Sequence, residues 1–201
     1  PIGRWMKLGD EDRRVLLIAS IAAGFGSVFG TPLAGAVFSM EFFLTGRIRY
    51  NAIFPAFLAA IIANYVTLLW PAQHTHYSIG SVPTVNALNL LYSLLAGIAF
   101  GFCALLFSKT MHGLTAFFKS KISYPPLRPF VGGILVALAV YALGTTKYIG
   151  LGIPTIVDSF SNAQPRYVFA LKIALTVLTI SAGFKGGEVT PLFFIGATLG
   201  N

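Results

Sequence analysis

Acidic residues and cysteine are scarce in this sequence. Only 6 of its 201 residues are Asp or Glu, and charged residues of both signs make up 10% of the chain, well below the roughly 25% of soluble globular domains. The single cysteine, Cys103, cannot form an intramolecular disulfide. The 14 Lys and Arg residues give a net charge of +8, but they fall between apolar segments and form no basic stripe with interleaved aromatics. This distribution argues against a nucleic-acid-binding protein.

Three long segments contain no Asp, Glu, Lys or Arg, namely residues 15–40, 50–108 and 129–146. A transmembrane helix needs about 20 apolar residues, so the segment 50–108 is long enough to cross a bilayer twice. Hydrophobic residues make up 56% of the chain, which is more apolar surface than a soluble protein of this size can bury. The sequence therefore predicts an all-α integral membrane protein.

Glycine and proline interrupt these apolar segments at residues 30–35, 150–154 and 186–191. Both residue types end helices, and glycine lets the backbone come close to its surroundings. We expect two short helices in series over 15–44, spans near 52–70, 88–107 and 129–143, and a basic segment at 109–128. A broken helix survives in a membrane only where protein buries it or where it lines a cavity. The pattern is typical of transporters with discontinuous helices.

The hexapeptide at 186–191 reads Gly-Gly-Glu-Val-Thr-Pro and stands between two uncharged apolar stretches. A proline in the first turn of the following helix leaves the N–H groups around Val189 and Thr190 without intrahelical partners. Such N–H groups and the helix dipole together favour a bound anion. The alternative is an ordinary helix start with Thr190 as its cap. The first interpretation predicts an anion pathway.

Residues 23–38, which read AGFGSVFGTPLAGAVF, and the hexapeptide resemble two motifs, in the same order, of the CLC family of chloride channels and anion–proton antiporters. The resemblance implies a CLC-type bundle of tilted, broken transmembrane helices, part of an inverted-repeat transporter. It extends over nearly the whole chain, so residues 1–201 are expected to form a single transmembrane domain that is incomplete at both ends. The family's outer gating glutamate and central tyrosine would lie before Pro1 and after Asn201. The resemblance also implies a homodimer in a bacterial plasma membrane, without a cofactor.

Two positions depart from the family pattern. At the phenylalanine of the family's G-x-F-x-P loop this chain has Val189, followed by Thr190, and this substitution resembles the branch that exports fluoride in exchange for protons. Many antiporters of the family also carry two adjacent acids at the end of the first motif, the second of which serves protons from the cytosolic side. Here the pair is Glu41 and Phe42. The resemblance thus implies fluoride–proton antiport without the usual inner proton relay.

The candidate site residues fall into three groups. The expected anion-binding residues are Gly187, Glu188, Val189 and Thr190, and the expected pore-lining residues at the helix breaks are Gly30, Thr31, Pro32 and Pro191. Glu41 is the candidate for proton transfer, although a salt bridge with Arg47 is the alternative. Glu188 could repel the anion, carry a proton or accept hydrogen bonds from the loop. Lys185 could concentrate anions at the pore mouth or extend to an interface.

Other classes of function remain as alternatives. Within the same family, the alternative is a chloride channel or chloride–proton exchanger. An intramembrane enzyme would need a cluster of catalytic groups, but Glu41, Lys172 and Glu188 are well separated in the sequence, and we expect no enzyme. An assembly subunit would not require repeated helix breaks. His74 and His76 lie in a polar loop without acids or cysteine, so we expect them to be solvated rather than to bind a metal.

Overall fold

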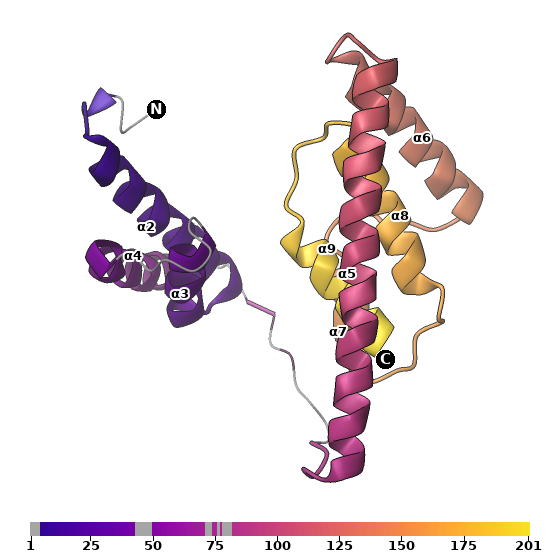
Figure 1. Cartoon of the computed structure of the whole chain (residues 1–201), viewed down its shortest axis with the longest axis horizontal. Helices are drawn as coiled ribbons and strands as arrows, with labels where there is room; N and C mark the ends of the chain where they lie inside the picture. Colours follow the sequence, from indigo (N-terminus) through magenta and orange to yellow (C-terminus); the bar gives the residue numbers. More distant parts are fainter. Residues whose placement is uncertain (1–4, 43–49, 71–73, 76, 78–81) are drawn as a thin grey trace. The chain divides into compact units, whose positions relative to one another are not determined.

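Helices account for all the regular secondary structure in residues 5–42, 50–70, 74–75, 77 and 82–201, the part of the chain that this computed structural model describes. Eight helices and no strand occur in these residues (Figure 1), which confirms the predicted all-α class. The chain divides into two units, Pro1–His76 and Tyr77–Asn201.

The first unit contains α2 (Asp10–Phe29), α3 (Pro32–Phe42) and α4 (Tyr50–Leu68). Three acidic residues occupy the first turn of α2, where they interact favourably with the positive end of the helix dipole. The helix ends at Gly30, whose φ of 66° is the left-handed conformation that glycine adopts without a Cβ clash. Pro32 then begins α3, as expected for a residue with a preset helical φ and no N–H to satisfy. The predicted break between two helices in series is confirmed.

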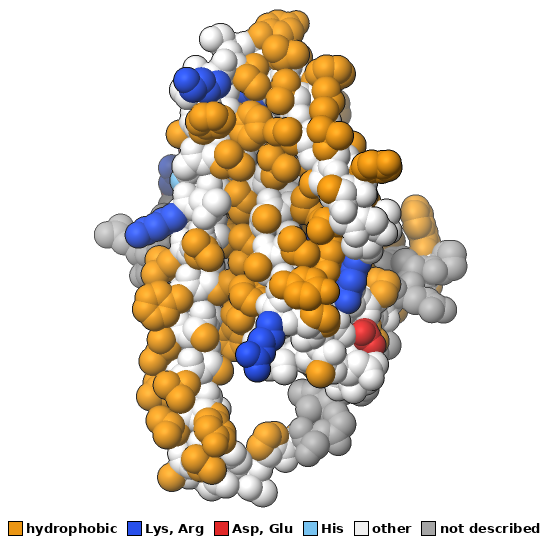
Figure 2. All heavy atoms as spheres, turned by 90° about the vertical axis from the view of Figure 1, so that its right-hand side faces the viewer, with side chains coloured by type: hydrophobic (Ala, Val, Ile, Leu, Met, Phe, Trp, Pro, Cys, Tyr) orange, Lys and Arg blue, Asp and Glu red, His pale blue; other side chains and the backbone are white. Residues whose placement is uncertain are grey.

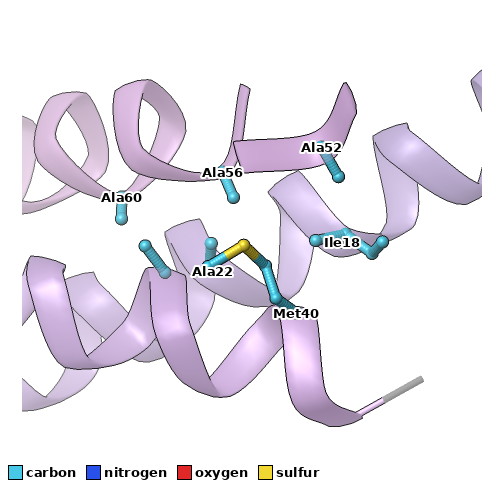
Figure 3. Packing of buried hydrophobic residues seen from close by; sticks show 7 residues of the cluster. Ile18, Ala22, Met40, Ala52, Ala56 and Ala60 are labelled. Atoms are coloured by element: carbon cyan, nitrogen blue, oxygen red, sulfur yellow. The ribbon is translucent and has the colours of Figure 1, made fainter. Parts of the chain in front are cut away.

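Small side chains form the core of the first unit (Figure 3). Ala22 of α2 and Ala56 and Ala60 of α4 are fully buried, and Ile18 and Met40 pack with them. Alanine at these positions lets the three helices approach closely, which is how helices associate when lipid removes the hydrophobic contrast with the surroundings. The polar hydroxyl of Ser39 in this interior donates to the Ala36 carbonyl at 2.7 Å. The first unit is therefore held together by close backbone packing.

Helices α2 and α3 approach each other closely at Gly35. A Cβ atom at this position would lie 2.8 Å from the amide nitrogen of Gly26 and 3.0 Å from the carbonyl oxygen of Ala22. Both are backbone atoms, so they cannot move aside as a flexible side chain could. Glycine at position 35 is therefore required by the packing of these two helices. Gly24 lies on the same helix as Gly26, but a Cβ atom there would meet nothing within 4 Å.

We expect Gly35→Ala to lower the free energy of unfolding by about 1–3 kcal/mol, the usual range for overpacking. Gly24→Ala is the matched control, because it adds the same methyl group in open space. That control should leave stability unchanged or raise it by up to about 1 kcal/mol through helix propensity. Thermal unfolding of the detergent-solubilised full-length protein measures both effects. Equal midpoint shifts in the two variants would contradict this account of the α2–α3 contact.

The second unit contains α5 (Ala87–Lys121), α6 (Leu127–Leu143), α7 (Ile153–Asp158), α8 (Val168–Ser181) and α9 (Val189–Gly200). Helix α8 packs against α5, α6 and α9, while α7 packs against α9 (Figure 1). Two hydrophobic clusters result: one around Phe194 and Val168, the other around Phe107 and Val177. Gly132 of α6 lies against Ala182, and a Cβ atom there would overlap that alanine side chain. Helix α8 is thus the central element of this unit.

Helix α5 is longer than the sequence pattern indicates. It runs for 35 residues, about 52 Å at 1.5 Å per residue, so the basic segment that follows the predicted span at 88–107 is helical as far as Lys121. The Asn86 side chain caps its start by accepting a hydrogen bond from the Asn89 amide at 2.8 Å. The reason for the extension is local: from Lys109 to Lys121 there is no proline and only one glycine, and Lys, Met and Leu favour the helix.

The surface of the described chain is largely apolar. Figure 2 shows a face on which hydrophobic side chains cover most of the area and Lys and Arg are few and scattered. Helix α5 exposes Leu91, Leu94, Ile98, Phe102 and Leu105. Among the described helices, α4 and α5 are long and apolar enough to cross a membrane. An apolar surface of this extent is what a lipid-facing protein requires, in agreement with the predicted membrane class.

Candidate functional site

The site is built where α8 ends and α9 begins. The hydroxyl of Ser181 at the end of α8 donates to the Met111 carbonyl of α5 at 3.1 Å, and Gly183 then turns the chain with φ 98°. Residues 184–187 follow without regular structure and are exposed. The predicted break at the hexapeptide is therefore confirmed, and α5 fixes the end of the helix that precedes it.

Helix α9 begins with two amides that have no hydrogen-bond acceptor in the described chain. Glu188 is the cap residue, and its carbonyl accepts from the Leu192 amide at 3.0 Å, the first hydrogen bond of the helix. Val189 and Thr190 are the first two helical residues, and their N–H groups donate to no described residue. Pro191, the third, has no N–H group and is buried. The unpartnered amides expected at this break are therefore present, and the cap residue is Glu188 rather than Thr190.

The Glu188 side chain makes no capping hydrogen bond at the start of α9. Glu188, Val189 and Thr190 are each partly buried, between the exposed glycines and the buried proline. The sequence left three roles open for Glu188, and one of them, accepting hydrogen bonds from the loop, is matched by no bond to its carboxyl among the described residues. A half-buried carboxyl group without that bond remains available to exchange a proton or to face an ion.

A cavity of about 380 Å³ adjoins this helix start. Gly186, Gly187 and Pro191 line it from the hexapeptide, while residues 148–151 line it from the segment before α7. One side of α8 completes the wall with Lys172, Leu175, Thr176 and Thr179. The lining is mostly apolar with a few polar groups, as in most ligand sites. Val136 of α6 also lines it, so the second unit brings four segments distant in sequence to one cavity.

Lys172 is the charged side chain in this wall. It is 1% exposed, and its Nζ donates to the carbonyl oxygens of Gly150 at 2.7 Å and Tyr148 at 3.1 Å. The Nζ also lies 4.9 Å from the centroid of the buried Phe194 ring, a cation–π distance. No role for Lys172 is predicted from the sequence. The sequence does contain a signal for such a role, because Lys172 is a lone lysine in the otherwise uncharged stretch 167–182. An ionisable residue within a membrane span indicates function.

The segment 148–152, which precedes α7 and lines the cavity with residues 148–151, owes its backbone conformation to two glycines. Gly150 and Gly152 have φ values of 64° and 71°, which side chains with a Cβ rarely adopt. A Cβ atom on Gly152 would also overlap the ring of Phe194 in α9. The predicted break at residues 150–154 is confirmed, and its glycines let the segment pack directly on α9 beside Lys172.

A polar cluster holds the far end of α7. The side-chain amides of Asn162 and Gln164 each donate to Asp158 at 2.6 Å, and these hydrogen bonds lower the pKa of that carboxyl from its ordinary value. The ammonium of Lys147 donates in turn to Gln164 at 2.9 Å. The cluster therefore ties the segment before α7 to the segment after it.

The remaining candidates lie in the first unit. Gly30 ends α2, Thr31 is an exposed connecting residue, and Pro32 begins α3. Glu41 is exposed near the end of α3. Its alternative partner, Arg47, lies outside the described residues. The candidates therefore form two groups, this set in the first unit and the hexapeptide in the second.

His74 lies within the described part of its loop, and its environment differs from the predicted solvation. His74 is partly buried rather than solvated: its Nε2 lies 2.7 Å from the Ser27 carbonyl oxygen, and its ring stands against Gly30. It covers the end of α2, where carbonyl groups need partners. His76 lies outside the described residues. His112 of α5 has its Nδ1 2.7 Å from the Ser108 carbonyl, and Lys185 is exposed.

Comparison with known proteins gives consistent matches. The profile of a family described as voltage gated chloride channel matches residues 2–201. A chloride/fluoride channel protein of Pseudomonas syringae pv. tomato is 53% identical over 201 residues, which cover 97% of this chain and 44% of that protein. The voltage-gated ClC-type chloride channel ClcB of Escherichia coli O157:H7 is 28% identical over 196 residues, covering 94% and 46% of the two chains.

A solved structure matches the fold. The crystal structure of a CLC-type fluoride/proton antiporter superposes with a TM-score of 0.91 at 34% identity, over 99% of this chain and 50% of that one. The chain thus spans about half the length of the curated relatives and of the solved structure that it matches.

Proposed function

Since this chain belongs to the voltage-gated chloride channel family, an anion-transporting family of integral membrane proteins, we propose that the full-length protein exports fluoride in exchange for protons. The observation that carries the proposal is the start of α9, where the Val189 and Thr190 amides have no acceptor within the described chain. Gly187 and Pro191, on either side of these residues, line the 380 Å³ cavity. Helix N-termini with free amides are established anion sites.

Fluoride fits this helix start for a chemical reason. The ion is small and strongly hydrated, so a site must replace its water with several close donors. Two backbone amides and the Thr190 hydroxyl can supply three donors within two residues. Val189 contributes an apolar side chain smaller than the phenylalanine of the family's commoner loop. The anion site we propose therefore comprises Gly187, Glu188, Val189 and Thr190.

Protons require a separate titratable group. Glu41 is exposed near the end of α3, in an apolar helix where an ionisable residue is otherwise unfavourable. We assign it the transfer of protons, while Glu188 beside the anion can take part through its half-buried carboxyl. The breaks at Gly30, Thr31 and Pro32 would line the pathway in the first unit, and Pro191 in the second.

The names of two matched proteins support the choice of ion. One relative is named a chloride/fluoride channel protein, and the matched structure is that of a fluoride/proton antiporter. The competing function is a chloride channel or chloride–proton exchanger, which the name of the more distant ClcB favours. Liposomes that contain the full-length protein separate the two, since ion-selective electrodes record the efflux of each halide. We expect fluoride efflux to exceed chloride efflux, and the reverse order would favour the competing function.

We further propose that the protein forms a homodimer in the bacterial plasma membrane. Helices α3 and α4 expose apolar side chains that include Val37, Phe42, Phe54 and Ile62, and apolar helix faces with small residues favour association in lipid. Single-molecule photobleaching of the labelled full-length protein in bilayers should give two-step bleaching. Single-step events throughout would contradict the dimer.

A further inference from the structure

Lys172 is a buried cation without a carboxylate partner in the described chain. It lies in the first half of α8 with 1% of its surface exposed. The ion pairs found among the described residues, Arg13 with Asp10 and Arg14 with Glu11, leave it out. Its Nζ donates to two backbone carbonyls, of Tyr148 and Gly150, and an ammonium carries three N–H donors.

These contacts favour the charged form without neutralising it. The two carbonyl dipoles and the face of the Phe194 ring, 4.9 Å from Nζ, attract a cation but carry no net charge. A buried ammonium is strongly unfavourable unless an opposite charge compensates it. The described residues supply no carboxylate, so an anion bound next to Lys172 would be the compensating charge.

The cavity beside Lys172 is suited to supply that charge as a bound ion. Its volume of about 380 Å³ compares with roughly 30 Å³ for one water molecule in the liquid, so it accommodates a small anion with part of its hydration shell. None of the described residues that line it is acidic, while Thr176 and Thr179 contribute hydroxyl groups. The Thr179 hydroxyl already donates to the Leu175 carbonyl at 2.7 Å. The exposed Gly186 and Gly187 of the hexapeptide border the same space.

We propose that this cavity is a second anion site, with Lys172 as the counter-ion of a monovalent inorganic anion such as fluoride or chloride. The site is distinct from the start of α9 but shares the wall at Gly186 and Gly187 with it, so an anion held by Lys172 is adjacent to the hexapeptide. The inference rests on the proposed function and deepens it by adding a residue and a position to the anion path.

We expect the Lys172 site to contribute mainly to anion affinity and the start of α9 mainly to selectivity between anions. A point charge attracts every monovalent anion by the same Coulomb law, whereas a hydroxyl and two amides distinguish ions by how much water they must lose. Removal of the Lys172 charge should therefore weaken fluoride and chloride binding together. Changes at Thr190 should alter the ratio between the two ions.

The test uses the purified full-length protein in detergent, titrated with sodium fluoride and with sodium chloride at constant ionic strength. Bound halide raises the thermal midpoint, so the dependence of Tm on concentration gives the apparent Kd. Lys172→Gln removes the charge but keeps N–H donors for the two carbonyls. It should raise the apparent Kd for both halides by about one to two orders of magnitude, the range for loss of a charged hydrogen-bond partner. Lys172→Arg should stay within a few fold of the wild type, because it keeps the charge.

Lys119→Gln is the matched control, since Lys119 is an exposed lysine near the end of α5, and it should behave as the wild type. A purely structural role for Lys172 gives a different result. Lys172→Gln would then lower Tm in halide-free buffer, while the halide-dependent rise would match the wild type, and this outcome would overturn the proposal.

A second measurement needs no variant. Wild-type crystals soaked in sodium bromide should show an anomalous peak in the cavity next to the Lys172 Nζ, and the absence of such a peak would overturn the inference even if Lys172→Gln does not fold. Both measurements report binding rather than transport. A protein that binds halide in this cavity but gives no halide flux in liposomes would retain the second site and lose the proposed function.

Discussion

Thr190→Val is expected to reduce fluoride affinity by about one to two orders of magnitude, because a hydrogen bond to a charged partner contributes roughly 1.5–3 kcal/mol. Valine keeps the shape of threonine and removes only the hydroxyl, so the start of α9 retains its two free amides. Chloride is more weakly hydrated and demands less of its donors. Fluoride transport should therefore decline more than chloride transport.

The neighbouring Val189→Phe should shift preference towards chloride, since it restores the residue of the commoner family loop. Thr190→Ser, which keeps the hydroxyl, should retain fluoride preference. Thr198→Val in the same helix is the matched control, because the buried Thr198 hydroxyl is already bonded to the Phe194 carbonyl at 2.8 Å. Halide efflux from liposomes that contain each full-length variant gives the fluoride-to-chloride ratio. An unchanged ratio in both Thr190→Val and Val189→Phe would mean that selectivity is set elsewhere in the protein.

Glu41→Gln is expected to abolish fluoride-driven proton uptake while fluoride binding persists. Glutamine has the shape of glutamate but cannot take up and release a proton at neutral pH. Glu41 stands in an apolar helix, and the residue that follows it, Phe42, cannot replace it as a proton carrier. With the proton route interrupted, a fluoride gradient should no longer change the pH outside the liposomes.

The matched control for this experiment is Glu11→Gln. Glu11 is also an exposed glutamate, but it lies in the first turn of α2, 3.9 Å from Arg14. Its neutralisation should leave coupling intact. Full coupling in Glu41→Gln would contradict the assignment and leave Glu41 as a boundary residue.

The helix breaks were predictable because glycine and proline act locally. Gly30 ends one helix with a positive φ that glycine adopts easily, and Pro32 begins the next with its preset helical φ and missing N–H. Glycine and proline act in the same way at the breaks at 150–154 and 186–191. The free amides of Val189 and Thr190 follow from helix geometry and from the proline at the third position. The membrane class follows from composition, and the CLC-type fold from two long motifs.

Features that depend on tertiary contacts were not predictable. The position of Lys172 beside the hexapeptide requires α8, α9 and the segment 148–151 to come together, and no local pattern encodes that arrangement. The burial of His74 likewise depends on its contact with Gly30, 44 positions away in the sequence. The extension of α5 to Lys121 has a local cause instead, because hydropathy marks only the apolar span at 88–107 while Lys, Met and Leu continue the helix beyond it.

The most direct test of fluoride–proton antiport is a simultaneous record of halide release and external pH. Liposomes that contain the wild-type full-length protein are loaded with fluoride or with chloride and diluted into halide-free buffer. The account predicts that fluoride leaves faster than chloride and that protons move inward as fluoride moves out, so the external pH rises even without a proton gradient. Chloride release as fast as that of fluoride, or fluoride release without any change in external pH, would contradict it.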